Sequence, residues 1–464
     1  MDEKELLRQI DAFVENNREN VIKDMKTLVD INSVQGAPEA GAPFGSGPRR
    51  ALEAALDIAA SMGLVTGNCE GYVGYADLPG RKADQIALVT HLDVVPEGKG
   101  WTENPFCMRL KDGYAIGRGT ADDKGPAVIT LYVAKFFKEQ GKELPYTLRI
   151  LFGTNEETGM ADMTYYLAHY PQPKFCFSPD SRFPVGYAEK GGYSGWLVSA
   201  PVEGNLKEFV GGEAKNVVPD YAYARVKGEG DSLKDTDRVT VRKENGCVYL
   251  EAHGIGGHVA GPQGSVNAIG LLVEYLLDNG LCIAPSEKRA LDMLRTLHSD
   301  TDGCTLGIAC TDETFGPLTC VGGMIRLEEG RLKQSVDIRY PSSIQAVELK
   351  AALDRLAEGA GGLFEPTAAR VPFQINPDLP EIRTLTDTYN ELTGREEKPF
   401  TMGGGTYARC FANAISYGPG EADRPRPSWA GPAHGADEAM EMEQLYRALR
   451  IYILAVARLM KLDF

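Results

Sequence analysis

Histidine and carboxylate side chains recur at positions where together they could bind metal ions. The candidates are His91, Asp93, Asp122, Asp123, Glu156, Glu157, Asp180 and His434. Imidazole and carboxylate groups are ligands that zinc, manganese and cobalt accept. Two such ions sharing one carboxylate can polarise a carbonyl and activate a water molecule. These residue types are therefore suited to the hydrolysis of an amide bond.

Each of these signals is weak when taken alone. A His-x-Asp step is more often a hydrogen-bonded pair, Asp-Asp often caps a helix, and Glu-Glu is usually solvated. However, the chain has only six histidines, and His91 and His434 both fall in acidic clusters near glycine or proline. We therefore interpret the candidates as one site. His169, His253 and His298 lie in no such cluster and are interpreted as surface or satisfied core residues.

The segments expected to hold these residues alternate between strand and helix. Apolar runs at residues 86–90 and 146–153 predict buried strands, and each leads directly into candidate residues. Between them, residues 127–140 have helical spacing. This alternation predicts an α/β fold. Further helices are expected at residues 4–30, 49–62 and 441–462.

The central part of the chain has a different texture, which predicts an inserted domain. From about residue 189 onward, short β-type segments and turn signals dominate, with strands expected at 220–226, 238–253 and 334–340. Helices are expected at 267–279 and 347–358. We predict a catalytic domain formed by residues 1–187 and 382–464, with an α+β lid domain at 188–381.

Composition limits the class of protein. The chain has 464 residues, 43% of them hydrophobic, which is too long for one compact core. A net charge of −16, spread along the chain, argues against a nucleic-acid partner. The nine cysteines include no CxxC pair, which favours reduced thiols and a cytoplasmic location. We expect neither a signal peptide nor a membrane segment.

The order of the motifs resembles a family of dinuclear metallopeptidases that includes carboxypeptidase G, aminoacylase, succinyl-diaminopimelate desuccinylase and carnosinase. The resemblance covers essentially the whole chain and rests on HLDVVPEG (91–98), GRGTADDKGP (117–126), NEETG (155–159), SPD (178–180), GHVAGPQGSVNA (257–268), DIRYP (337–341), GGGTYAR (403–409) and AHGADE (433–438). DDKGP, EKGG (189–192), GGGTYAR and the long insertion are most similar to the branch of bacterial dipeptidase V, the PepV-like Xaa-His dipeptidases. The resemblance implies a phosphorylase/hydrolase-like α/β catalytic domain with an inserted lid.

The resemblance also implies two divalent metal ions and a ligand set for them. Asp122 would bridge the ions, His91 and Asp180 would complete one of them, and Glu157 and His434 would complete the other. Zinc is the first candidate, and manganese and cobalt are alternatives.

Two acidic residues beside the ligands would have other roles by the same resemblance. Glu156 would be the general base that moves a proton from water to the leaving amine. Asp93 would hold the far nitrogen of His91. A cis peptide bond is implied between Asp122 and Asp123.

Substrate contacts are implied in the lid and in the glycine-rich loop. His258 would donate to the oxyanion, and Asn216 and Arg339 would hold the substrate. The loop residues Gly403, Gly404, Gly405 and Thr406 could bind a carboxylate through main-chain N–H groups, although a plain flexible turn is the alternative. Ile255, Val259 and Ala260 depart from the family's usual residues near His258. For Arg118 and Lys124, substrate contact and charge compensation both remain open.

These implications lead to one expected function and two alternatives. We expect a metal-dependent dipeptidase that takes small, unblocked peptides, and an insertion of about 190 residues, large enough to be a domain, favours a monomer. The first alternative is an N-acyl amino acid deacylase or desuccinylase. The second alternative, from a different class, is a non-catalytic metal-containing binding protein.

Overall fold

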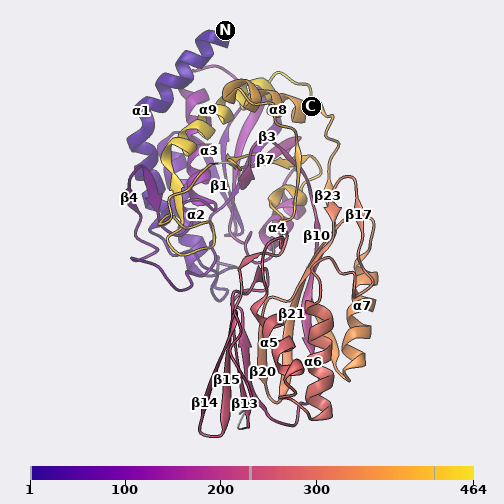
Figure 1. The fold of residues 1–464 in the computed structure, drawn as a ribbon. Helices are drawn as coiled ribbons and strands as arrows, with labels where there is room; N and C mark the ends of the chain where they lie inside the picture. Colours follow the sequence, from indigo (N-terminus) through magenta and orange to yellow (C-terminus); the bar gives the residue numbers. More distant parts are fainter. Residues whose placement is uncertain (1–2, 229–231, 423) are drawn as a thin grey trace. The chain divides into compact units, whose positions relative to one another are not determined.

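The chain forms two compact units, each described here by itself (Figure 1). The computed structural model describes residues 3–228, 232–422 and 424–464. Unit 1 consists of Met1–Tyr187, Gln374–Phe400 and Gly405–Phe464, and unit 2 of Ala188–Phe373 and Thr401–Gly404. The sequence-based division set its second boundary at residue 381, close to where helix α8 begins, whereas unit 1 resumes at Gln374.

Unit 1 contains the ends of the chain. Its helices are α1 (Glu3–Val29), α2 (Ser46–Ser61), α3 (Lys124–Glu139), α4 (Ala161–His169), α8 (Pro380–Thr393), α9 (Met442–Leu459) and the 3-10 helix η1 (Tyr407–Cys410). Its strands are β1 (Val65–Cys69), β2 (Val73–Leu78), β3 (Lys82–His91), β4 (Arg109–Lys111), β5 (Tyr114–Ile116), β6 (Tyr146–Gly153), β7 (Phe175–Ser178), β8 (Ser181–Arg182), β25 (Ala414–Ser416), β26 (Pro419–Gly420) and β27 (Ala439–Glu441). Strands β9 (Gly186–Glu189), β23 (Phe373–Gln374) and β24 (Phe400–Met402) lie where the chain changes unit.

The central sheet of unit 1 has the strand order β1-β2-β6-β3-β7-β25. Strands β6, β3, β7 and β25 are parallel neighbours, and β2 joins them antiparallel. Every residue of β6 is buried, which agrees with its largely apolar sequence, and its buried Arg149 donates to Asp77. The α/β class predicted from the sequence is confirmed, and the apolar runs 86–90 and 146–153 lie within β3 and β6.

Helices cover this sheet with apolar stripes. In α1, Ile10, Phe13, Val14, Val21 and Met25 are buried, and they recur at intervals of about one helical turn or two. Helix α3 contacts β3 and β6, while α9 packs against α1, α3 and α8. The C-terminal helix thus completes the core that the N-terminal segment begins.

Unit 2 is an antiparallel sheet with helices packed on it. The strand order is β14-β15-β13-β11-β20-β21-β10-β22. Its helices are α5 (Ala268–Asp278), α6 (Pro285–His298) and α7 (Ala346–Gly359). Its strands are β10 (Gly191–Val198), β11 (Leu206–Gly211), β12 (Val217–Val218), β13 (Tyr221–Lys227), β14 (Val239–Glu244), β15 (Cys247–His253), β16 (Gly257–His258), β17 (Thr311–Asp312), β18 (Gly316–Pro317), β19 (Thr319–Val321), β20 (Ile325–Glu328), β21 (Arg331–Tyr340) and β22 (Leu363–Arg370). Helix α6 was not predicted, although its buried Ala290, Leu291, Leu294 and Leu297 have helical spacing.

The sequence also predicted reduced cysteines and no membrane segment. All nine cysteines are free thiols. Within the described ranges, no helix has the length and apolar character needed to cross a bilayer.

Candidate metal centre

The carboxyl ends of three parallel strands bring the candidate residues together. His91 is the last residue of β3, which lies between β6 and β7. Glu156 and Glu157 follow the end of β6, and Asp180 follows the end of β7. Because parallel strands end at the same edge of a sheet, side chains placed just after them meet there.

Asp122 lies between two imidazoles. The Nε2 atom of His91 is 2.9 Å from Asp122 Oδ1 and 3.9 Å from Asp180 Oδ2. The Nε2 atom of His434 is 3.0 Å from Asp122 Oδ2 and 3.1 Å from Glu157 Oε1. Each imidazole therefore shares Asp122 and faces one further carboxylate, so five residues from five separate segments form one cluster.

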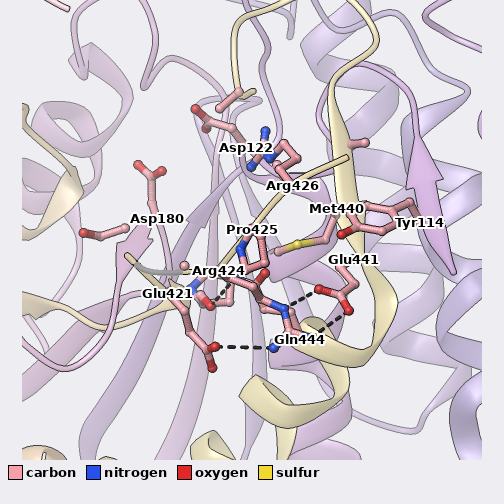
Figure 2. A pocket seen from close by; sticks show the side chains of 16 residues that line it. Tyr114, Asp122, Asp180, Glu421, Arg424, Pro425, Arg426, Met440, Glu441 and Gln444 are labelled. Atoms are coloured by element: carbon pink, nitrogen blue, oxygen red, sulfur yellow. Dashed lines mark hydrogen bonds and ion pairs between the residues drawn. The ribbon is translucent and has the colours of Figure 1, made fainter. Parts of the chain in front are cut away.

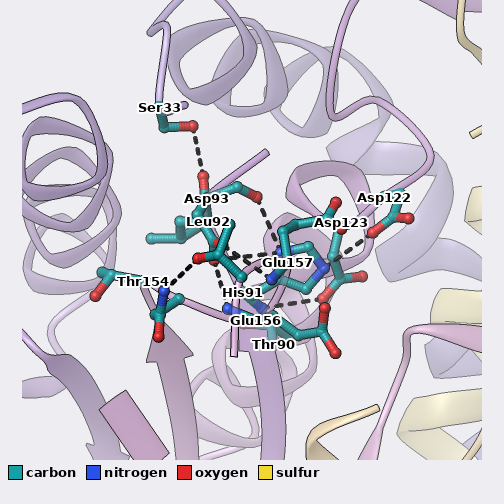
Figure 3. A network of polar contacts seen from close by, with 12 residues as sticks. Ser33, Thr90, His91, Leu92, Asp93, Asp122, Asp123, Thr154, Glu156 and Glu157 are labelled. Atoms are coloured by element: carbon teal, nitrogen blue, oxygen red, sulfur yellow. Dashed lines mark hydrogen bonds and ion pairs between the residues drawn. The ribbon is translucent and has the colours of Figure 1, made fainter. Parts of the chain in front are cut away.

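Asp122 and Asp123 occupy the turn that leads into α3. The peptide bond between them is cis, as the resemblance implied. The Asp123 carboxylate accepts the main-chain N–H of His91 at 3.2 Å, which ties this turn to the end of β3 (Figure 3). The turn and the strand end are thereby held in register.

Asp93 contacts both the imidazole and the segment that contains the two glutamates (Figure 3). The Nδ1 atom of His91 is 2.9 Å from the main-chain oxygen of Asp93 and 3.6 Å from its carboxylate. That carboxylate accepts the main-chain N–H groups of Glu156 and Glu157, each at 3.1 Å. The nearest partner of the imidazole is thus a carbonyl, and the carboxylate of Asp93 mainly orients the Glu156–Glu157 segment.

A buried ion pair that sequence reasoning did not identify joins two loops of the centre. Arg118 Nη1 donates to Glu438 Oε2 at 2.7 Å, with side chains only 1% and 0% exposed. Glu438 Oε1 accepts the main-chain N–H groups of Ala121 at 2.9 Å and of Asp122 at 3.2 Å. Arg118 Nη2 donates to the main-chain oxygen of His434 at 3.2 Å. The pair therefore holds the backbone of both Asp122 and His434.

The burial of Arg118 bears on an alternative left open by the sequence. Its guanidinium donates to Glu438 and to main-chain oxygens of three residues, which favours charge compensation over substrate contact. Lys124 is also buried, and its Nζ donates to the main-chain oxygen of Ile31 at 2.7 Å.

A second buried contact reaches the glutamate segment from the C-terminal part of the chain. Asp162 accepts the main-chain N–H groups of Thr154 at 2.7 Å and Asn155 at 3.0 Å, together with the hydroxyl of Tyr407. Burial raises the pKa of Asp162 to about 6. The Tyr407 hydroxyl lies against Gly153, where a side chain would meet it at 2.0 Å. No spacing in the sequence connects these residues.

The electrostatics of the cluster suit cations. Burial, followed by the charge of Asp122, raises the pKa values of Glu157 and Asp180. Burial would also raise the pKa of Asp122, but hydrogen bonds with His434 and His91 lower it. Ligand atoms of His91, Asp122 and Glu157 lie within 4.8 Å of one another, as do those of His91, Glu156 and Asp180. A group of buried and half-buried acids that repel one another, with one buried and one exposed imidazole, fits divalent metal ions.

In unit 2, the structure brings Asn216 and His258 together. Strands β12 and β16 pair Val217 with His258, and Val259 donates its N–H to the main-chain oxygen of Asn216 at 3.2 Å. His258 is exposed, and its Nδ1 accepts the N–H of Ala260 at 3.1 Å.

Arg339 and the glycine-rich loop adjoin this pair. Arg339 donates to Asp337 at 2.7 Å and to the main-chain oxygen of Gly403 at 3.2 Å. A side chain at Gly403 would collide with Ala260 at 2.3 Å. Gly403 and Gly404 belong to unit 2, whereas Gly405 and Thr406 belong to unit 1, where Thr406 caps η1.

Comparisons with known proteins agree with the centre. Residues 87–458 match the model of peptidase family M20/M25/M40. The protein "Putative dipeptidase YtjP" of Bacillus subtilis (strain 168) is 32% identical over 464 residues, covering 96% of this chain and 98% of that protein. The Beta-Ala-Xaa dipeptidase of Lactobacillus delbrueckii subsp. lactis is 29% identical over 471 residues, covering 97% and 98%.

A solved structure shows the same fold at low sequence identity. Human carnosine dipeptidase 1 aligns with a TM-score of 0.61 and 13% identity, covering 98% of this chain and 100% of that one.

Replacing Arg118 by methionine should strongly destabilise unit 1. The change leaves Glu438 buried without its charged partner, which costs about 3–5 kcal/mol. Arg450→Met is the matched control, because Arg450 pairs with Asp11 where both side chains are about half exposed (46% and 50%). Breaking that exposed pair should cost less than about 1 kcal/mol. Urea unfolding of the two variants measures the difference, and equal unfolding midpoints would contradict the role given to Arg118.

Proposed function

Since the chain belongs to peptidase family M20/M25/M40 and is a metallopeptidase, we propose that it is a dipeptidase that cleaves unblocked dipeptides at a dinuclear metal centre. The proposal rests on one observation. The carboxylate of Asp122 lies within 3.0 Å of the imidazoles of both His91 and His434, and each imidazole faces one further carboxylate. The dipeptidase names of relatives that align over nearly the full chain support the substrate class.

The ligand assignment follows the pairs of contacts. Asp122 would be shared by the two ions, His91 and Asp180 would hold one of them, and Glu157 and His434 would hold the other, in line with the contacts of each imidazole. Zinc is the first candidate, and manganese and cobalt suit the same donors.

Two divalent ions, when bound, polarise the scissile carbonyl and make a water molecule more acidic. Glu156 accepts the proton of the attacking water and delivers it to the leaving amine. Its side chain is only 8% exposed, and burial raises its pKa, so its carboxylate is a stronger base than one in water. The two hydrogen bonds from its own and the next N–H to Asp93 hold the segment in place.

From unit 2, the proposal assigns substrate binding to the cluster around His258. His258 donates to the oxyanion, and Asn216 and Arg339 hold the carbonyl oxygen and terminal carboxylate of the substrate. Gly403, Gly404, Gly405 and Thr406 add main-chain donors. That the protein is a monomer and that it is cytoplasmic both stay predictions from the sequence.

Glu156→Gln should lower kcat by about 10²–10⁴-fold, because the amide cannot accept the proton. Its metal content should stay unchanged. Glu157→Gln is the adjacent comparison and should lose bound metal, since that carboxylate is assigned as a ligand. Steady-state kinetics and metal analysis test both variants, and full activity in Glu156→Gln would refute the mechanism.

Removal of metal should abolish hydrolysis, and adding back one ion type at a time should restore it. His434→Ala should bind fewer ions per chain than the wild type. The control His169→Ala changes an exposed histidine in the same unit and should leave the metal content unaltered. Metal analysis after dialysis gives the number of ions, and two ions retained by His434→Ala would contradict the assignment.

A substrate screen separates the dipeptidase from an N-acyl amino acid deacylase. Free dipeptides should be hydrolysed faster than N-acetylated or N-succinylated amino acids. Amine release from each class is measured with the metal-loaded enzyme. Faster hydrolysis of the N-acyl substrates would replace the proposed function by deacylation.

A further inference from the structure

A polar pocket of about 340 Å³ in unit 1 adjoins the candidate metal centre (Figure 2). Asp122 and Asp180 line it together with Glu421, Arg424 and Glu441. Two strand pairs build it. Strand β26 pairs with β8, which places the segment after Pro419 beside Asp180, and β27 pairs with β5 at the other wall. The C-terminal segment therefore supplies much of the pocket.

An arginine and two glutamates of the pocket wall contact one another. Arg424 lies between Glu421 and Glu441 (Figure 2). It donates to both carboxylate oxygens of Glu441, from Nη2 at 2.6 Å, and its Nη1 is 3.5 Å from Glu421. Glu421 also accepts from Arg447 Nη1 at 2.8 and 3.0 Å. The side-chain amide of Gln444 donates a hydrogen bond from Nε2 to the main-chain oxygen of Pro419 at 2.9 Å. Apart from Asp122 and Asp180, which are assigned to the metal ions, the lining has two acids, Glu421 and Glu441, and two arginines, Arg424 and Arg426. Its charged part is therefore balanced, and it lies beside apolar residues that include Met440 and Pro425.

We propose that this pocket receives the side chain of the substrate's amino-terminal residue and selects polar, uncharged side chains over apolar ones of equal size. The inference rests on the proposed function, in which the reacting carbonyl belongs to that residue and lies at Asp122. Asp122 and Asp180 both line the pocket. The side chain of the residue whose carbonyl lies at Asp122 is therefore the substrate group that the pocket adjoins.

The chemistry of the wall sets the preference. An apolar side chain would remove water from the Arg424–Glu441 pair and offer no hydrogen bond in return, which is unfavourable. A side-chain amide can both donate and accept there. Glutamine and methionine side chains have similar length and volume, so they differ mainly in this property.

The experiment compares kcat/KM for Gln-Ala and Met-Ala, each divided by kcat/KM for Gly-Ala, whose first residue has no side chain. In the wild type, Gln-Ala should exceed Met-Ala by about tenfold or more, since a mismatched polar contact costs at least that factor. A ratio near one would overturn the inference, whatever the variants do.

The double variant Arg424→Met/Glu441→Met makes the wall apolar and removes both charges together, so no charge of this pair is left alone. The ratio of Gln-Ala to Met-Ala should fall to about one or below. An unchanged ratio in the folded variant would overturn the inference. If the double variant does not fold, Gln444→Met is the second variant, because Gln444 lines the same wall. It should also lower the ratio of Gln-Ala to Met-Ala. An unchanged ratio in Gln444→Met would overturn the inference as well.

The matched control is Arg18→Met/Glu443→Met. Like Arg424, Arg18 donates to both oxygens of one carboxylate, here through Nη1 and through Nη2 at 3.2 Å. Its partner Glu443 lies in the same helix as Gln444 but outside the pocket. The control should keep the wild-type ratio, and a matching fall would assign the effect to α9 in general and overturn the inference. Failure to hydrolyse any dipeptide, Gly-Ala included, would instead overturn the proposed function and this inference with it.

Discussion

Holding several carboxylates within a few ångströms of one another in a buried site is the constraint on which unit 1 depends. Burial raises the pKa values of Glu157 and Asp180, and the negative charge of Asp122 raises them further. Three kinds of group oppose this repulsion: the imidazoles of His91 and His434, main-chain N–H donors, and the buried guanidinium of Arg118. Divalent ions would supply the remaining positive charge.

Pairs that are distant in sequence hold the loops that carry these acids. Glu438 binds main-chain groups of the turn at Asp122, more than 300 residues away. Tyr407 reaches Asp162, which in turn holds the segment before Glu156. A carboxylate buried among main-chain donors fixes a loop more firmly than a flexible surface contact does. This explains why the C-terminal segment returns to the first sheet and is packed there by α9.

By the two proposals above, the same C-terminal segment contributes to the chemistry and to the choice of substrate. It carries His434, one of the imidazoles at Asp122, and within the next ten residues it carries Glu441 and Gln444 of the adjoining pocket. A single stretch of chain thus couples the assigned ligand to the polar wall. Changes in the pocket wall are therefore expected to act close to the reacting carbonyl.

The sequence by itself determined the α/β class and the strands that end at His91 and shortly before Glu156, because buried strands are largely apolar. It also predicted the set of acids and imidazoles, since ligands often follow the ends of such strands. Helix α6 was also predictable from the sequence, because its buried residues recur at helical spacing. Only the tertiary structure decided which groups support the centre. The partners of Glu438, Asp162 and Arg424 are set by how distant segments pack, and no spacing along the chain records that packing.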